Sequence, residues 1–186
     1  MRIVYDHDPA HDFYIETIGE PGSRQFFFVI ESELGQTVIS SEKEQVIALI
    51  ERLEEILREI RIRHLNSKQY VPTPLIVHQE IPFPVEESFH AGLIGITWIA
   101  ETEQISIEIQ EYSSDPEFQE LLPIGDEIVG EYAPDIAGAC LEIGQVKNFI
   151  SESKVKIDSG RQPCPFCGLP IDLSGHLCPR ANGYRR

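Results

Sequence analysis

The chain has 186 residues, of which 41% are hydrophobic and 25% are charged, and its formal net charge at pH 7 is -16. This length suits one domain with a small appendage rather than two full domains, and the composition is that of a folded globular protein. The sequence shows neither a signal peptide nor an apolar stretch of the roughly 20 residues that a membrane span needs, so we expect a cytoplasmic protein.

The negative charge is concentrated in the middle of the sequence. Residues 69–146 contain fifteen acidic side chains and no lysine or arginine, whereas residues 147–186 carry a net charge of +4. Such an acidic middle repels nucleic acid and anionic membranes, which argues against duplex binding and against a membrane partner. The acidic stretch is either a solvated surface or a docking surface for the basic tail, within one chain or between chains.

The first half of the chain predicts an antiparallel meander of three strands. Three runs rich in β-branched and aromatic residues are separated by short turns that contain glycine, and short turns join antiparallel neighbours. These strands are expected at residues 13–18, 25–30 and 36–40.

A long helical pattern follows this meander. Apolar residues recur at helical spacing from Val46 onward, which predicts a helix that ends near Arg63 and covers the sheet with its apolar face. Ser41 and Glu44 form a capping-box pattern at its start. The proline-rich residues 64–90 are then expected to form an ordered crossing loop.

The second half of the chain repeats this order. Three further strands are expected at residues 93–100, 104–112 and 139–143. A helix follows them and ends near Ser159. Residues 45–50 resemble residues 145–150, which favours a duplicated β-β-β-α unit at residues 12–63 and 91–160, although helix starts also resemble one another for physical reasons.

We therefore predict an α+β domain over residues 1–160. Its six strands would form one antiparallel sheet or two half-sheets, with both helices on one face. Residues 161–186 would form a small separate tail, because so short a segment cannot build a core of its own.

The tail contains a metal-binding pattern. Cys164, Cys167, His176 and Cys178 are spaced as Cys-x2-Cys-x8-His-x-Cys. Zinc takes four soft or borderline ligands at tetrahedral corners, and a Cys-x2-Cys turn supplies two of them from one tight loop. In a reducing compartment such a cluster favours a metal site over disulfides. The pattern predicts a zinc knuckle.

Four protein ligands would fill the coordination shell of the ion, so we predict a structural rather than a catalytic zinc. Apolar side chains of the tail are expected to form a small shell around it, namely Phe166, Leu169, Ile171, Leu173 and Leu177. The remaining cysteine, Cys140, lies in an apolar strand and is interpreted as a buried small side chain.

Basic residues of the tail are candidate contacts for a partner or a phosphate group. They are Arg161, Arg180, Arg185 and Arg186, together with the aromatic Tyr184. This composition suits phosphate or single-stranded nucleic acid, and it suits pairing with the acidic middle equally well. Arg24 is a further candidate because the turn before it offers amide groups to an anion, although a plain β-turn explains that segment too.

The N-terminal stretch is rich in aspartate and histidine. Its members are Asp6, His7, Asp8, His11 and Asp12. Such groups can hold a divalent ion, but we interpret them as a polar turn in a mobile region before the first strand.

The chain resembles a family of uncharacterised bacterial proteins known as domain of unknown function 3090, found mainly in actinobacteria and chloroflexi. The resemblance is carried by residues 160–168 (GRQPCPFCG), residues 175–186 (GHLCPRANGYRR) and residues 17–24 (TIGEPGSR). It implies a bacterial, cytoplasmic protein with a zinc-binding-like motif at its C-terminus. The family has no assigned activity, so the resemblance implies no catalytic residue.

The sequence contains no phosphate-binding P-loop, nucleophile elbow or Rossmann fingerprint. Our first hypothesis is a non-enzymatic binding or adaptor protein whose zinc knuckle and arginine-rich tail contact a protein or a phosphate-bearing ligand. The alternative is a hydrolase of phosphorylated substrates that holds a second metal in the acidic loops of residues 80–135. RNA binding by the tail is a third hypothesis.

Overall fold

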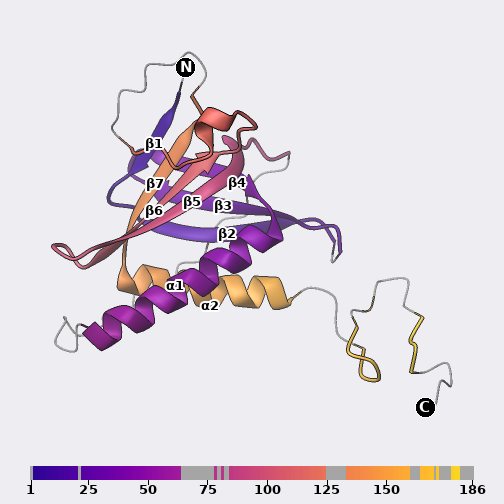
Figure 1. Ribbon diagram of the computed structural model, residues 1–186. Helices are drawn as coiled ribbons and strands as arrows, with labels where there is room; N and C mark the ends of the chain where they lie inside the picture. The colour runs from indigo at the N-terminus through magenta and orange to yellow at the C-terminus, as the bar shows by residue number, and fades with distance from the viewer. Residues whose placement is uncertain are drawn as a thin grey trace.

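The computed structural model describes residues 2–20, 22–63, 78, 81, 84–124, 133–159, 164–169, 171 and 177–180. Within these residues the chain forms seven strands, a short 3₁₀-helix and two α-helices (Figure 1). In chain order they are β1 (Val4–His7), β2 (Asp12–Ile18), β3 (Gln25–Ser32), β4 (Gly35–Ser41), α1 (Lys43–Arg63), β5 (Phe89–Ile99), β6 (Gln104–Glu111), η1 (Pro116–Phe118), β7 (Ile136–Glu142) and α2 (Ile143–Asp158). The predicted α+β class and the repeated β-β-β-α order are confirmed, while the boundary at residue 160 stays a prediction.

The strands form one sheet in the order β1-β7-β6-β5-β4-β3-β2. The sheet is mostly antiparallel, as predicted, but the pairs β4–β5 and β1–β7 are parallel. The parallel pair β4–β5 agrees with the length of chain between its strands, because α1 and residues 64–88 separate them and parallel strands need a long connection. Both helices lie on the same side of the sheet (Figure 1), in agreement with the prediction.

The sheet curls until its two ends meet. β1 and β2 lie at opposite ends of the strand order, yet only residues 8–11 separate them in the chain. Within this segment the amide of Ala10 donates to the carbonyl of Cys140 on β7 at 3.1 Å, and the amide of His11 donates to the carbonyl of Glu31 on β3 at 2.7 Å. One short segment is therefore bonded to both ends of the sheet, which closes it into a barrel-like core.

The polar, mobile turn predicted for residues 6–12 is wrong for His7, because this residue ends strand β1. His7 on β1 is only 3% exposed, and its ring nitrogens Nδ1 and Nε2 lie 2.8 Å and 2.7 Å from the hydroxyls of Ser32 and Thr37. These hydroxyls belong to β3 and β4, so the ring ties β1 to the opposite part of the sheet. Burial lowers the pKa of His7, and the carboxylate of Asp6 opposes that shift. Both ring nitrogens thus serve the fold rather than an ion.

Both helices begin with the same local arrangement. The amide of Glu42 donates to the side-chain oxygen of Gln45 at 2.9 Å before α1, and the amide of Glu142 donates to that of Gln145 at 2.8 Å before α2. At α1 this bond therefore begins at Glu42, one residue after the predicted Ser41, because the buried hydroxyl of Ser41 donates to a carbonyl of β3 instead.

The same two glutamines join the two halves of the molecule. The side-chain amide of Gln45 donates to two carbonyls in β5, at 3.0 Å and 3.1 Å. That of Gln145 donates to two carbonyls just before β2, at 3.0 Å and 2.9 Å. The start of α1 is therefore anchored to β5, the first strand of the second β-β-β-α unit. The start of α2 is anchored to the segment that leads into β2, the first strand of the first unit. These matched contacts give the sequence similarity between the two helix starts a physical cause.

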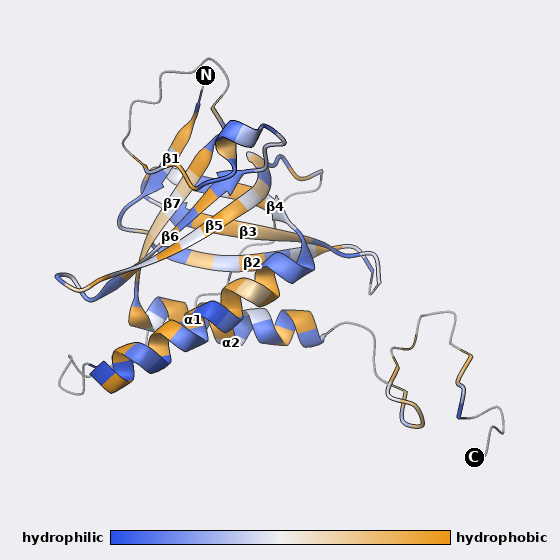
Figure 2. Cartoon of the chain, viewed as in Figure 1, coloured by the Kyte–Doolittle hydropathy of each residue, from blue (hydrophilic) through white to orange (hydrophobic). Residues whose placement is uncertain are grey.

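The hydrophobic core lies between the curled sheet and the helices. The ring of Phe149 on α2 stacks on Phe13 with centroids 4.6 Å apart, and Phe13 in turn stacks on Phe28 at 5.8 Å. The predicted apolar face of α1 is buried at Val46, Leu49, Ile50, Leu53, Ile56 and Ile60. Figure 2 shows both hydrophobic and hydrophilic residues along each helix, as expected for helices with one buried face.

We expect His7 to make the stability of the protein depend on pH. Its pKa is lowered from 6.5 in the folded state, so the unfolded chain takes up a proton that the folded chain does not. Stability is then lost as the pH falls below the unfolded pKa, by on the order of 1 kcal/mol per pH unit until the folded pKa is reached. Urea unfolding at a series of pH values from about 8 to 5 measures this loss.

The matched variants are His7→Gln and His90→Gln. Glutamine at position 7 can still bond to the two hydroxyls but does not titrate, so this part of the pH dependence should disappear. His90 is exposed and bonds to Ser40 at 3.0 Å, so its replacement is the control for the loss of a histidine outside the core. Identical pH profiles for the wild type and His7→Gln would show that the prediction is wrong.

Candidate metal centre

The Cys-x2-Cys segment folds into a tight turn. The amide of Gly168 donates to the carbonyl of Cys164 at 2.8 Å, and the amide of Cys164 donates to the carbonyl of Leu169 at 2.8 Å. Gly168 has φ +76°, a left-handed conformation that side chains disfavour. The turn therefore depends on glycine at this position, and it brings the sulfurs of Cys164 and Cys167 to the same side.

Three of the four predicted ligands come together in the structure. The sulfur atoms of Cys164, Cys167 and Cys178 all lie within 4.8 Å of one another, and those of Cys164 and Cys178 are 3.7 Å apart. Tetrahedral zinc with Zn–S bonds of about 2.3 Å places its sulfurs about 3.8 Å apart. These three cysteines form no disulfide with one another. The donor set therefore fits a thiophilic ion such as zinc.

The local hydrogen bonds favour ionisation of one thiol. Burial opposes loss of the Cys164 proton, but the backbone amides of Cys167 and Phe166 donate to its sulfur and hold its pKa below the usual value. For Cys167 burial and the neighbouring thiols outweigh the amide of Leu169, so its pKa is raised. Several sulfurs this close together cannot all ionise without a cation, which is the charge that a bound metal supplies.

Several predicted site residues lie outside the described residues. They are the fourth predicted ligand, His176, and the predicted contacts Arg161, Tyr184, Arg185 and Arg186. Their roles stay predictions. Cys140 is 7% exposed, and burial followed by the adjacent Asp8 raises its pKa. This agrees with its interpretation as a buried side chain away from the metal centre.

The two described arginines among the predicted contacts both bond to backbone carbonyls. Arg180 donates to the carbonyl of Phe166 at 3.0 Å, so it braces the knuckle. Arg24 donates to the carbonyls of Lys156 and Ser159 at 3.2 Å and 3.1 Å and to the hydroxyl of Ser159 at 3.0 Å. It thus caps the C-terminal end of α2, where helix carbonyls lack partners within the helix. Because carbonyls at a helix C-terminus need donors from elsewhere in the chain, they are the signal from which the capping role of Arg24 could have been predicted.

The apolar residues of the knuckle do not form the expected shell. Phe166 is 64% exposed, Leu169 is 52% exposed and Leu177 is 87% exposed. The prediction of a shell is wrong for these three, because a segment so short has too few atoms to cover its own apolar side chains. The sulfurs of Cys164 and Cys178 are buried instead, at 5% and 8% residue exposure, and the apolar groups face solvent around them.

A second cluster of ionisable residues joins β2, α2 and the segment that contains His78. The Nδ1 atom of His78 lies 3.1 Å from Asp12, and its Nε2 atom lies 2.9 Å from Glu152. The ring also stacks on Tyr14 with centroids 3.7 Å apart. Burial raises the pKa of Asp12, and the nearby ring of His78 opposes this shift. Sequence patterns could not reveal this cluster, because its members are far apart in the chain.

The geometry of this cluster is that of a clamp. The two carboxylates of Asp12 and Glu152 approach opposite edges of one ring, so they do not converge on a common point with it. The hydroxyl of Tyr14 donates to Glu31 at 3.0 Å, and burial followed by this carboxylate raises the pKa of the phenol. Every polar contact therefore links neighbouring elements of the fold.

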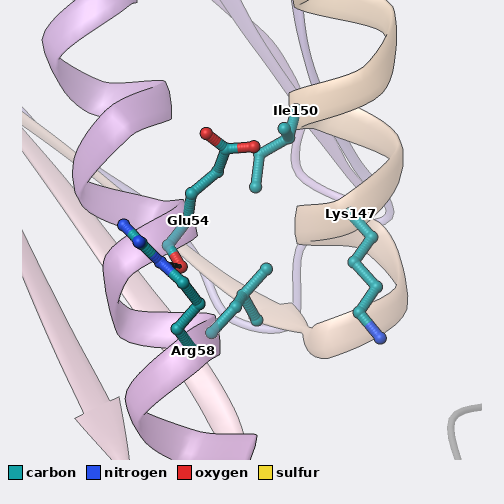
Figure 3. Close-up of a pocket in the computed structure, with 5 residues that line it drawn as sticks. Glu54, Arg58, Lys147 and Ile150 are labelled. Atoms are coloured by element: carbon teal, nitrogen blue, oxygen red, sulfur yellow. Dashed lines mark hydrogen bonds between the residues drawn. The ribbon is translucent and has the colours of Figure 1, made fainter.

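A groove of about 450 Å³ runs between the two helices (Figure 3). It is lined by Glu54, Leu57, Arg58, Lys147 and Ile150. Glu54 pairs with Lys154 at 2.6 Å, and Figure 3 shows the side chains of Arg58 and Lys147 directed away from each other. The polar groups of this groove therefore do not converge as those of a binding site do.

A family model described as a protein of unknown function, DUF3090, matches residues 5–178. The chain belongs to this family. The match spans the sheet, both helices and the three clustered cysteines, and it confirms the resemblance seen in the sequence. No curated protein and no solved structure matches the chain. Neither of the helices in the described residues is long and apolar enough to cross a membrane.

The left-handed conformation of Gly168 yields a matched pair of variants. A Cβ atom added there would meet nothing within 4 Å, so Gly168→Ala tests backbone conformation alone. Alanine disfavours this conformation by about 1–2 kcal/mol, which predicts a roughly 5- to 30-fold loss of zinc affinity. Asparagine tolerates positive φ, so Gly168→Asn should lose much less. Competition with a zinc-binding dye measures both, and equal affinities for the two variants would contradict the prediction.

Proposed function

We propose that this protein is a non-enzymatic binding protein whose C-terminal knuckle holds a structural zinc ion. The ligands are Cys164, Cys167, His176 and Cys178, and the observation that carries the proposal is the convergence of the three sulfurs within 4.8 Å. Three thiolates and one imidazole complete a tetrahedron, which leaves no open position for water or substrate. The ion supplies the folding free energy that so short a segment cannot obtain from a core.

The proposed function of the knuckle is to present a contact surface to another protein. Phe166 and Leu177 are 64% and 87% exposed, and exposed apolar groups on so small a segment favour a protein contact over a phosphate site. Arg180 donates to the carbonyl of Phe166, which holds a cation next to that residue. The remaining tail arginines add positive charge, so the partner is a protein with an acidic surface.

The hydrolase alternative would require a second metal in the acidic loops. Within the described residues, the group whose ligand atoms lie close enough to share one ion is the cysteine cluster. The clamp around His78 places its carboxylates on opposite edges of the ring. These observations therefore favour the binding protein over the hydrolase.

Metal analysis of the purified full chain tests the zinc site. We expect one zinc ion per wild-type chain. Cys164→Ser and His176→Ala should each lose more than about 10- to 100-fold in zinc affinity, because each variant lacks a direct ligand. Cys140→Ser is the control, since that buried cysteine lies on β7 and should retain zinc. Full zinc binding by Cys164→Ser would refute the proposal.

The contact surface is tested by affinity capture with the zinc-loaded chain. Leu177→Asp should reduce capture of acidic proteins without loss of zinc. Leu34→Asp changes a side chain that is 81% exposed in the turn between β3 and β4, and it should have no effect. Equal capture by both variants would contradict the proposed role of the knuckle.

A further inference from the structure

We propose that the three clustered cysteines form a redox switch, in which a hydroperoxide oxidises Cys167, Cys164 closes a disulfide with it, and the zinc ion is released. This inference rests on the proposed function, because it concerns the regulation of the same site. It follows from the unequal exposure of the three cysteines, from the turn that holds Cys164 beside Cys167, and from the contrast with Cys140.

The three cysteines of the cluster differ in their access to solvent. Cys164 and Cys178 are buried, whereas Cys167 is partly exposed. A zinc ion binds cysteine as the thiolate, and the thiolate is the form that reacts with oxidants. Among thiolates, susceptibility to oxidation follows exposure. A small oxidant in the solvent therefore reaches Cys167 before the other two.

The backbone holds the two cysteines of the Cys-x2-Cys turn together. The amide of Gly168 donates to the carbonyl of Cys164, and the amide of Cys164 donates to the carbonyl of Leu169, both at 2.8 Å. Residues three apart in a tight turn have Cα atoms less than about 7 Å apart, and a disulfide can bridge that distance. Because these bonds lie in the backbone, Cys164 stays within reach of Cys167 after the ion leaves.

Cys178 also has its sulfur close to the turn, 3.7 Å from that of Cys164. It lies farther along the chain, however, since ten residues separate it from Cys167 and only two separate Cys164 from Cys167. A longer loop costs more entropy to close, and the backbone bonds of the turn have already closed the shorter one. The disulfide therefore forms within the turn.

The chemistry requires a hydroperoxide as oxidant and no other redox group. The thiolate of Cys167 attacks a peroxide oxygen, so that an S–O bond forms, the O–O bond breaks and hydroxide leaves, which makes Cys167 a sulfenic acid. The thiolate of Cys164 then attacks this sulfur, the S–S bond forms, the S–O bond breaks and a second hydroxide leaves. Two electrons pass from the sulfurs to the peroxide, and both hydroxides take up protons to give water.

Disulfide formation removes two of the four proposed zinc ligands. Zinc binds thiolate sulfur, so the two oxidised cysteines no longer hold the ion. The ion supplies the folding free energy of this short segment, and its loss therefore undoes the knuckle. Phe166 lies in the turn and Leu177 adjoins Cys178, so the parts of the knuckle that carry them are no longer joined through the ion. The proposed contact with a protein partner is then lost under oxidising conditions.

Cys140 provides a control within the same chain. It is buried on β7, and burial followed by the adjacent carboxylate of Asp8 raises the pKa of its thiol. A buried, protonated thiol is a poor nucleophile. Cys140 should therefore stay reduced while the cluster is oxidised.

Treatment of the zinc-loaded full chain with hydrogen peroxide tests the proposal. A chromogenic chelator follows zinc release, thiols are counted after denaturation in acid, and mass spectrometry maps the disulfides. We expect the loss of one zinc ion and of two of the four thiols, with a disulfide between Cys164 and Cys167. Reduction with dithiothreitol should restore zinc binding. The matched variant Cys140→Ser should release zinc at the same rate as the wild type.

Zinc content before oxidation separates this inference from the proposed function. A chain that binds one zinc ion and keeps both the ion and its four thiols in excess peroxide would overturn the switch and leave the zinc site standing. A disulfide that contains Cys178 would overturn the choice of Cys164 as the partner of Cys167. Zinc loss that dithiothreitol does not reverse would contradict a switch. A chain that binds no zinc at the outset would overturn the proposed function and this inference with it.

Discussion

A few hydrogen bonds around residues 8–11 hold the curled sheet closed. The amides of Ala10 and His11 bond in opposite directions, to β7 and to β3, and the side chain of Gln145 donates to the carbonyls of the same two residues. Two sheet ends that would each present an unpaired edge therefore meet. Since Gln145 lies in the first turn of α2, the same contacts fix where α2 begins, and α2 in turn leads into the knuckle. The start of the helix that precedes the candidate metal centre in the chain thus depends on this closure.

Most elements of the fold could be predicted because their patterns are local. Alternation along a strand, glycine in a turn and the 3.6-residue period of α1 depend on neighbours in sequence. β1 has no such pattern, since four residues with an acidic side chain among them do not resemble a buried strand. It forms because His7 reaches the hydroxyls of Ser32 and Thr37, and because its backbone pairs with β7, about 130 positions away. Contacts of this kind exist only once the sheet has curled.

The same distinction holds for the candidate site. The convergence of three sulfurs could be predicted because Cys164 and Cys167 lie in one turn and Cys178 follows closely. The cap that Arg24 places on α2 and the clamp around His78 join residues far apart in the chain, so local spacing does not reveal them. The exposure of Leu177 reverses the expected shell. Leu177 therefore belongs to the exposed surface of the knuckle and not to a shell around the sulfur atoms.

X-ray absorption at the zinc edge of the purified full chain tests the central claim most directly, because it identifies the atoms around the ion without requiring a partner. The account predicts three sulfur ligands at about 2.3 Å and one nitrogen ligand at about 2.0–2.1 Å, with no oxygen from water. A shell dominated by oxygen and nitrogen, or one with an open position filled by water, would contradict a closed structural site at the knuckle.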